Sequence, residues 1–268
     1  MQNNFTIPQC PSVREIVNSF WQVDRQNNLL LKETIIPKGI VEIIFNFESA
    51  ELYAQINGPS LTIPKCFIQG FHTHPVQQQL TGRQVFFGVV LNPAAVKHIF
   101  HFHPSEFTNC VIDLTLVDPT LLALWHRLGE QKTFTERVNI FTEWLMQRLP
   151  RLTEREQAFN NFLNEHGNTA LSVNEVAGLF YYSSKQLSRK LHELTGMNTE
   201  QTLLYKKYLQ AIHLMHYSPL SLTQITYACH FSDQAHFIKT FRSLAMLTPK
   251  EYRYRKSDIK GHVLENVL

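Results

Sequence analysis

The sequence predicts a chain of two parts: an α+β part of antiparallel β-structure and helices, followed by an all-α part with two helix-turn-helix units. Three observations support this prediction. Short aliphatic runs separated by turn residues fill residues 1–110, which is typical of antiparallel strands. Pro150 ends a helical pattern, and helix-capping signatures recur at short intervals after it. Residues 171–195 and 221–245 then share one order of apolar and polar residues, which indicates a structural repeat.

The composition is that of a globular protein with reduced thiols. At 268 residues, of which 44% are hydrophobic, the chain is long enough for two separate cores. No apolar run approaches the roughly 18–20 residues that cross a bilayer, and the first residues lack the charge and apolar stretch of a secretory signal. Cys10, Cys66, Cys110 and Cys229 form no C-x-x-C pair. We therefore expect a cytoplasmic protein without membrane contact, whose cysteines are buried free thiols.

The elements expected in the first part follow from turn signals and periodicity. Runs of β-branched and aromatic residues predict strands, and the Asn57-Gly58 pair predicts a hairpin turn. Apolar residues at helical spacing predict helices after residue 93. Strands are expected at 40–47, 52–56, 66–70 and 85–91, and helices at 93–100, 120–129 and 135–149. Closely spaced strands without intervening helices favour an antiparallel sheet or barrel.

Histidines are the candidate metal ligands of the first part. Five of them lie within 32 positions, and the pair His72 and His74 would direct both rings to one side of a strand, as a metal site requires. No acidic residue lies close to this pair and Pro75 follows it, which favours a loop instead. We therefore expect no metal and no cofactor. Because no nucleophile or nucleotide-binding motif is present, we also expect no enzyme.

Aromatic residues are the candidate lining of a ligand pocket, since such pockets are largely apolar. The alternative is packing in the core, which we favour for most of them. The residues concerned are Trp21, Phe45, Phe47, Phe86 and Phe87.

The charge differs between the two parts. Residues 1–150 carry a net charge of −1 and residues 151–268 a net charge of +4, a mild bias toward an anionic partner in the second part. Pro150 marks the expected boundary. The predicted division is an α+β domain at 1–150, a helical domain at 151–257 and a C-terminal tail at 258–268.

The helical part repeats one unit at an offset of 49 to 50 residues. The helix faces formed by Leu187 and Leu191 correspond to those formed by Phe237 and Phe241. Ser232 is expected to be the N-cap of the last of these helices. Capping boxes are expected at Thr153, Ser172, Ser183, Ser221 and Thr248, and a stripe at helical spacing predicts one long connecting helix through Leu204, Tyr208, Ala211 and Met215.

Several segments of this part carry a known pattern. They are Leu171–Ala177, Ser183–Leu191, Leu194–Gly196, Phe231–Arg242 and, most specific, the closing Leu247-Thr248-Pro249-x-Glu251-Tyr252-Arg253. On these residues, segment 155–253 resembles the DNA-binding domain of the AraC/XylS family of bacterial transcription regulators. Three positions depart from the family pattern, because Thr226, His230 and Met246 stand where small residues are usual. Non-glycine residues at the last two positions are costly where φ is positive.

The resemblance implies that the second helix of each unit enters the major groove of double-stranded DNA, and that the two helices insert one helical turn apart. Arg189 is the best candidate for a bidentate contact with guanine, whereas Ala235 and Ile238 can only contact a thymine methyl group. For each basic residue the alternative is a solvated helix face. The implied DNA-facing residues are Lys185, Ser188 and Arg189 in the first unit and Gln234, Ala235, His236, Ile238 and Lys239 in the second.

The first part resembles an N-terminal domain of some family members in the segments around Trp21, Ile36–Gly39, Gly88–Pro93 and Glu106-Phe107. Such domains sense a small molecule or mediate dimerisation, often on a cupin-like β framework. The resemblance implies a transcription activator with DNA, RNA polymerase and a small-molecule effector as partners, and a homodimer as a further candidate. Two alternatives stay open: a metal-binding or enzymatic cupin-like module at 1–150, or an interaction adaptor with degenerate DNA binding.

Overall fold

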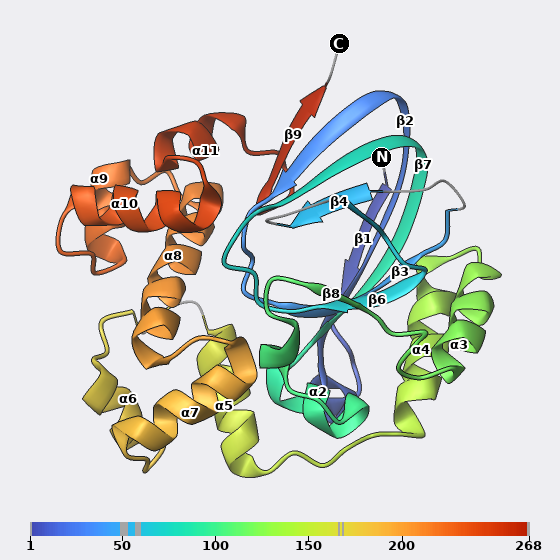
Figure 1. Cartoon of the computed structure of the whole chain (residues 1–268), viewed down its shortest axis with the longest axis horizontal. Coiled ribbons are helices and arrows are strands. Elements are labelled where there is room, and N and C mark those ends of the chain that lie inside the picture. The colour runs from blue at the N-terminus through green and yellow to red at the C-terminus, as the bar shows by residue number, and fades with distance from the viewer. Residues whose placement is uncertain (1, 49–52, 57–59, 166, 168, 267–268) are drawn as a thin grey trace.

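The strands gather on one side of the molecule and the two helix-turn-helix units on the other (Figure 1). The computed structural model describes residues 2–48, 53–56, 60–165, 167 and 169–266. The strands are β1 Gln2–Thr6, β2 Val17–Ile35, β3 Val41–Asn46, β4 Tyr53–Ile56, β5 Ser60–Thr62, β6 Cys66–Gln69, β7 Val76–Leu91, β8 Val111–Asp113 and β9 His262–Asn266. The helices of the first part are α1 Pro11–Arg14, α2 Pro93–Phe100, the 3-10 helix η1 Pro104–Phe107, α3 Thr120–Gly129 and α4 Phe134–Met146. Those of the second part are α5 Glu154–Asn164, α6 Val173–Leu179, α7 Ser184–Thr195, α8 Thr199–Tyr217, α9 Leu222–Ala228, α10 Gln234–Ala245 and α11 Pro249–Arg255.

The described strands form one antiparallel sheet, which confirms the predicted class of the first part. Their order is β1-β2-β7-β3-β6-β8, with β4 paired to β7 and β5, and β9 paired to β2. The long strands β2 and β7 pair along most of their length and make the centre of the sheet. The predicted strands at 40–47, 52–56, 66–70 and 85–91 correspond to β3, β4, β6 and part of β7, while Leu52 and the predicted Asn57-Gly58 turn lie outside the described residues.

Helices α3 and α4 cover one face of this sheet. The ring of Phe141 on α4 lies edge-on to Phe20 and Phe45, with centroid distances of 5.9 and 6.1 Å, and all three side chains are fully buried. Helices α2 and α3 have the predicted bounds. Helix α4 ends at Met146, short of the predicted residue 149, because Pro150 has no N–H to donate to the carbonyl of Met146 and its ring would clash with that carbonyl in a continued helix.

The helical part has the predicted elements and starts. All five expected capping boxes are present. In each, the Ser or Thr side chain accepts a hydrogen bond from the N3 amide, and the N3 side chain accepts one from the N-cap amide. The apolar stripe forms α8, the long connecting helix, in which Tyr208 and Ala211 are fully buried. The two helix-turn-helix units are therefore α6–α7 and α9–α10.

The predicted N-cap of α10 was wrong by one residue. Asp233 is the N-cap, and its Oδ1 accepts a hydrogen bond of 2.7 Å from the amide of His236. The turn of the second unit is one residue longer than that of the first, so Asp233 stands where Ser183 stands in the first unit. The hydroxyl of Ser232 lies instead 3.1 Å from Nδ1 of His236.

The four cysteines are free, as predicted, but only two of them are buried. Cys66 and Cys229 lie in the core, and burial raises the pKa of both thiols. Cys10 and Cys110 are exposed, because Cys10 precedes the surface helix α1 and Cys110 lies in the loop that follows η1. The expectation that all four are buried was wrong for these two.

A single hydrophobic cluster runs through both parts of the chain, from Val13 in the first part to Tyr252 and Val263 near the C-terminus. The first helix-turn-helix unit has a smaller cluster of its own around Phe159, Phe180 and Leu187. Over the described residues, no helix is both long and apolar enough to cross a bilayer. The division at residue 150, which falls in the loop between α4 and α5, stays a prediction.

Candidate DNA interface and ligand cavity

Helix α7 presents a basic face to solvent in the first unit. Leu187 and Leu191 are fully buried against α6, which directs the opposite side of the helix outward. Lys185 and Arg189 are exposed there, and Ser188 is half-buried beside them. Neither of the two cations makes a hydrogen bond or ion pair with another described residue, so both are available to an anionic partner.

Helix α10 presents a less polar face in the second unit. Gln234, Ala235 and Lys239 are exposed, and Ile238 keeps 38% of its surface in solvent. The half-buried ring of His236 bonds to Ser232 and lies edge-on to Phe231, so it packs against the turn of its own unit.

Helix α8 separates the two units. It contacts α7 near one end and α9 and α10 near the other (Figure 1). Its 19 residues give it a length of about 28 Å at the helical rise, close to the roughly 34 Å of one DNA turn. Buried Lys206 fixes α8 to α5, because its Nζ donates to the carbonyls of Phe162 and Glu165 at the end of that helix.

The three positions that depart from the family pattern are accommodated in different ways. His230 and Met246 adopt φ of 54° and 56°, the left-handed geometry that favours glycine. Tyr181 has φ of 54° in the equivalent turn of the first unit, so both turns carry this strain. Thr226 is buried, and its hydroxyl donates to the carbonyl of Leu222 one turn earlier in α9.

A cavity of about 530 Å³ lies against the sheet, on the side where the C-terminal segment returns. Its apolar wall is formed by side chains of β2, β3, β6 and β7, among them Trp21, Ile44, Phe67, Phe86 and Val90. The volume and the largely apolar wall suit a small organic ligand. Gly88 of β7 is required for this wall, because a Cβ there would lie 2.0 Å from Cε2 of Trp21.

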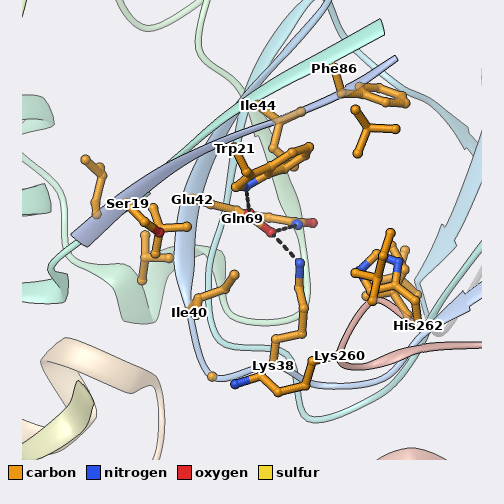
Figure 2. A pocket seen from close by; sticks show the side chains of 18 of the residues that line it. Ser19, Trp21, Lys38, Ile40, Glu42, Ile44, Gln69, Phe86, Lys260 and His262 are labelled. Atoms are coloured by element: carbon orange, nitrogen blue, oxygen red, sulfur yellow. Dashed lines mark hydrogen bonds and ion pairs between the residues drawn. The ribbon is translucent and has the colours of Figure 1, made fainter. Parts of the chain in front are cut away.

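A fully buried carboxylate, Glu42, lies on the wall of the cavity. It accepts hydrogen bonds from Nε1 of Trp21 at 2.9 Å, Nε2 of Gln69 at 2.7 Å and Nζ of Lys38 at 3.1 Å (Figure 2). Burial raises the pKa of Glu42, but the Lys38 charge and these bonds outweigh it, so the pKa lies below its ordinary value. Glu42 is therefore an ionised group whose acceptors are already used.

A second buried carboxylate, Glu33 on β2, joins the cavity wall to the C-terminal strand. Its Oε2 bonds to Arg25 at 2.7 Å and Gln78 at 2.6 Å, and its Oε1 lies 2.8 Å from Nδ1 of His262. Burial raises the pKa of Glu33, but the hydrogen bonds from His262 and Arg25, the charge of Arg25 and the charge that His262 gains in acid outweigh it and lower the pKa to about 2. Burial lowers the pKa of His262, so its ring is neutral near pH 7 and Nδ1 donates to the carboxylate.

Lys260 is the remaining cation of the cavity wall. Burial and the neighbouring Lys38 charge lower the pKa of its ammonium group. It makes no hydrogen bond or ion pair with any residue of the described ranges. The cavity thus has internally paired carboxylates and one unpaired ammonium group.

The candidate metal ligands do not assemble. His72 is buried, its pKa is lowered to about 4 by burial, and its Nδ1 has no partner among the described residues. His74 bonds to Thr73, and His98 of α2 pairs with Glu156 of α5 instead. No three described His, Cys, Asp or Glu side chains lie together as a metal site would need.

Of the candidate pocket aromatics, Trp21 and Phe86 line the cavity, while Phe45 and Phe87 are in the core and Phe47 packs against Trp125. The charged residues of the cavity were missed from the sequence. The available signal was Glu42, a charged residue within an apolar strand, which needs a partner if it is buried.

Comparisons with known proteins agree with this architecture. Residues 169–255 match a family described as a helix-turn-helix domain, and residues 6–113 match a domain of unknown function, DUF6597. The HTH-type transcriptional activator RhaS of Escherichia coli O1:K1 is 30% identical over 109 residues, which are 41% of this chain and 39% of RhaS. Residues 169–255 form an AraC-type helix-turn-helix domain. The chain spans about two fifths of the length of the curated relatives it matches.

Two solved structures extend the comparison. A transcriptional regulator with an AraC-type DNA-binding domain, from Chromobacterium violaceum, shares 30% identity over 32% of this chain and 78% of that one, at a TM-score of 0.31. Wild-type ToxT from Vibrio cholerae, solved with an unsaturated fatty acid bound, shares 12% identity over 95% of this chain and 97% of that one, at a TM-score of 0.47.

Proposed function

We propose that the protein is a transcription regulator that binds specific DNA sequences. The observation that carries this proposal is the pair of exposed helices, α7 and α10, attached near opposite ends of α8. Lys185, Arg189 and Lys239 project from these helices with no partner in the described residues. Unpaired cations on a helix face are suited to phosphates and guanine edges, and the AraC-type domain supports this use.

The two units have unequal roles in this proposal. Arg189 reads guanine from α7, with Lys185 and Ser188 beside it. On α10, Ala235 and Ile238 contact thymine methyl groups, and Gln234 and Lys239 contact bases or phosphates at the edge. His236, which packs against its own turn, contributes least.

We propose that the cavity binds the effector, a small molecule with an apolar body and an anionic head. The walls are apolar, and the carboxylates of Glu33 and Glu42 already have their hydrogen bonds. The unpaired ammonium of Lys260, next to that of Lys38, attracts an anion and repels a cation.

This effector class can be tested by calorimetry with sodium decanoate, and with decanol as a neutral molecule of the same chain length. We expect binding of decanoate that falls at least tenfold in Lys260→Ala and is absent for decanol. Equal binding of both molecules, or no effect of the substitution, would contradict an anionic effector. Mass spectrometry of ligands that copurify with the protein would identify the natural molecule.

The regulator is proposed to be an activator, as its relative RhaS is named, and to act through contact with RNA polymerase. Dimerisation through the first part stays a prediction. The alternative of an enzymatic or metal-binding module has weaker support, since the described histidines do not assemble. Metal analysis of the purified protein decides that alternative.

The proposed function is tested by gel mobility shift with the full chain. Duplexes selected by the protein from a random-sequence library are compared with a scrambled duplex, between about 50 and 200 mM salt. We expect affinity for the selected duplex to exceed that for the scrambled one by about 10³-fold or more, and to fall steeply with salt. Equal affinity for both duplexes would refute sequence-specific recognition and favour the adaptor alternative.

A further inference from the structure

The C-terminal segment Lys256–Asn266 connects the second helix-turn-helix unit directly to the sheet. It leaves α11 and returns as β9, which pairs antiparallel with β2 from Ile35 opposite His262 to Leu31 opposite Asn266 (Figure 1). The amide of Ile36 adds a bond of 2.9 Å to the carbonyl of Gly261, and Val263 is fully buried. This segment is therefore an integral part of the sheet.

The same segment forms part of the cavity wall. Ile259, Lys260 and His262 all line the cavity, and Lys260 lies beside Lys38 there (Figure 2). The hydrogen bond between His262 and Glu33 fixes the start of β9 to a wall residue of β2. A molecule that enters the cavity contacts Lys260 and His262 directly.

Tyr252 of α11 joins this segment to the helix that carries the second DNA face. Its fully buried ring packs on Phe241 of α10 at a centroid distance of 5.7 Å. Its hydroxyl accepts from the amide of Gly261 at 3.0 Å and lies 2.7 Å from Nε2 of His216 on α8. Burial lowers the pKa of His216 to about 4, so the ring is neutral and accepts the hydroxyl proton.

We infer that Lys256–Asn266 is a coupling segment that transmits the state of the cavity to α10. The path runs from the cavity wall at His262 through Gly261 to the Tyr252 hydroxyl, and from the Tyr252 ring to Phe241 on α10. The inference rests on the proposed function, since it assigns a route between the effector cavity and the second DNA-binding unit.

The physical basis is that the path consists of a few contacts, and each residue in it is held in place by its neighbours. β9 is held by backbone pairing and Tyr252 by two hydrogen bonds and buried ring contacts, so a shift of Lys260 or His262 has to be absorbed by α11 or passed to α10. Coupling of this kind is reciprocal: an effector that alters DNA affinity has its own affinity altered by DNA by the same factor.

The test compares three variants of the full chain with the wild type. Tyr252→Phe removes the hydroxyl that bonds to Gly261 and keeps the ring, and His262→Ala removes the side-chain hydrogen bond from β9 to Glu33. Tyr208→Phe is the matched control, because this tyrosine is equally buried and packs on Phe241 at 5.2 Å, but its hydroxyl has no partner in the described residues. Hydrogen–deuterium exchange is followed in the amides of α7 and α10.

We expect Tyr252→Phe and His262→Ala to accelerate exchange in α10 by about fivefold, while α7 exchanges as in the wild type. Tyr208→Phe should leave both helices unchanged. The inference is overturned if α10 keeps its wild-type exchange in His262→Ala, or if α7 accelerates as much as α10, which would indicate general destabilisation. This readout needs neither DNA nor effector, so it is independent of the proposed function.

A second measurement links the segment to regulation. The dissociation constant of the selected duplex is determined with and without sodium decanoate. We expect decanoate to change the dissociation constant of the wild type by about fivefold or more. In His262→Ala the dissociation constant should be nearly the same with and without decanoate. A response retained in His262→Ala would contradict the inference. If the wild type itself does not respond, the effector class is wrong, and the exchange experiment alone decides on the coupling segment.

Discussion

His262 donates a hydrogen bond of 2.8 Å to Glu33, although the two residues lie 229 positions apart in the chain. This contact joins the end of the helical part to the wall of a cavity in the sheet. β9 is part of the sheet, so the two halves of the chain are connected by a route other than the loop between α4 and α5.

The Glu33 cluster predicts a loss of stability in acid. The pKa of Glu33 is about 2 when folded, against an ordinary value of 4.5, so its contribution of about 3 kcal/mol is present above pH 4.5 and is lost as pH falls toward 2. Urea unfolding should show that the stability difference between wild type and Glu33→Gln narrows by about 1 kcal/mol between about pH 6.5 and about pH 3.5.

The control for this measurement is Glu143→Gln, because the Glu143 side chain is 67% exposed and its ion pair with Arg127 is on the surface. It should change the free energy of unfolding by less than about 0.5 kcal/mol at both pH values. A Glu33→Gln difference that stays constant with pH would show that the carboxylate is not stabilised in the folded state.

Arg189→Ala should weaken DNA binding more than the removal of an arginine elsewhere on the surface does. Loss of a bidentate guanine contact costs about 1–3 kcal/mol and relaxes discrimination at one base pair. Arg127→Ala, an exposed arginine on α3, is the matched control and should leave affinity unchanged. Mobility shifts on the selected duplex and on single-base variants of it measure both effects. If the two variants bind alike, Arg189 does not read the sequence.

Gly88→Ala should destabilise the protein and alter the cavity. Its new Cβ would lie 2.0 Å from the Trp21 ring, which has to move from the wall, at a cost of about 1–3 kcal/mol. Gly178→Ala is the control, and it should change the stability in the opposite direction. It adds a methyl group to exposed α6 with no atom within 4 Å, and should stabilise by up to about 1 kcal/mol. Thermal unfolding of both variants checks this pair, and destabilisation by Gly178→Ala or neutrality of Gly88→Ala would contradict it.

Met246→Gly should stabilise the second unit, because Met246 has φ of 56° and glycine adopts this conformation without strain. We expect a gain of about 1 kcal/mol, since the side chain is 62% exposed and contributes little packing. Met146→Gly, at the end of α4 and 49% exposed, should instead lose up to about 1 kcal/mol. Thermal unfolding distinguishes the two, and a loss of stability in Met246→Gly would show that the methionine packs more than its exposure indicates.

Local signals predicted the helical part well. Each capping box depends only on a side chain and an amide three residues later, so Thr153, Ser172 and Ser183 could be assigned from the sequence. The one error, Ser232 in place of Asp233, arose because the second turn is one residue longer and both residues are good caps. The positive φ of His230 and Met246 could be expected because the AraC/XylS pattern has glycine at these two positions.

Long-range pairing was not predictable in the same way. The tail 258–268 carries no strand signal strong enough to assign, and β9 exists because β2 offers a free edge to pair with. The cavity is likewise made by residues from distant segments, Glu33, Lys38 and Lys260 among them. Of the charged residues on the cavity wall, only Glu42 could be noticed from its sequence neighbours, because it is a charged residue within an apolar strand.

The central claim, that two units on one rigid helix read one face of DNA, is tested most directly by hydroxyl-radical footprinting of the full chain on its selected duplex. The account predicts two protected segments about 10–10.5 base pairs apart on the same face of the duplex. Arg189→Ala should weaken only one of them. A single protected segment, or protection without any sequence preference, would contradict the account.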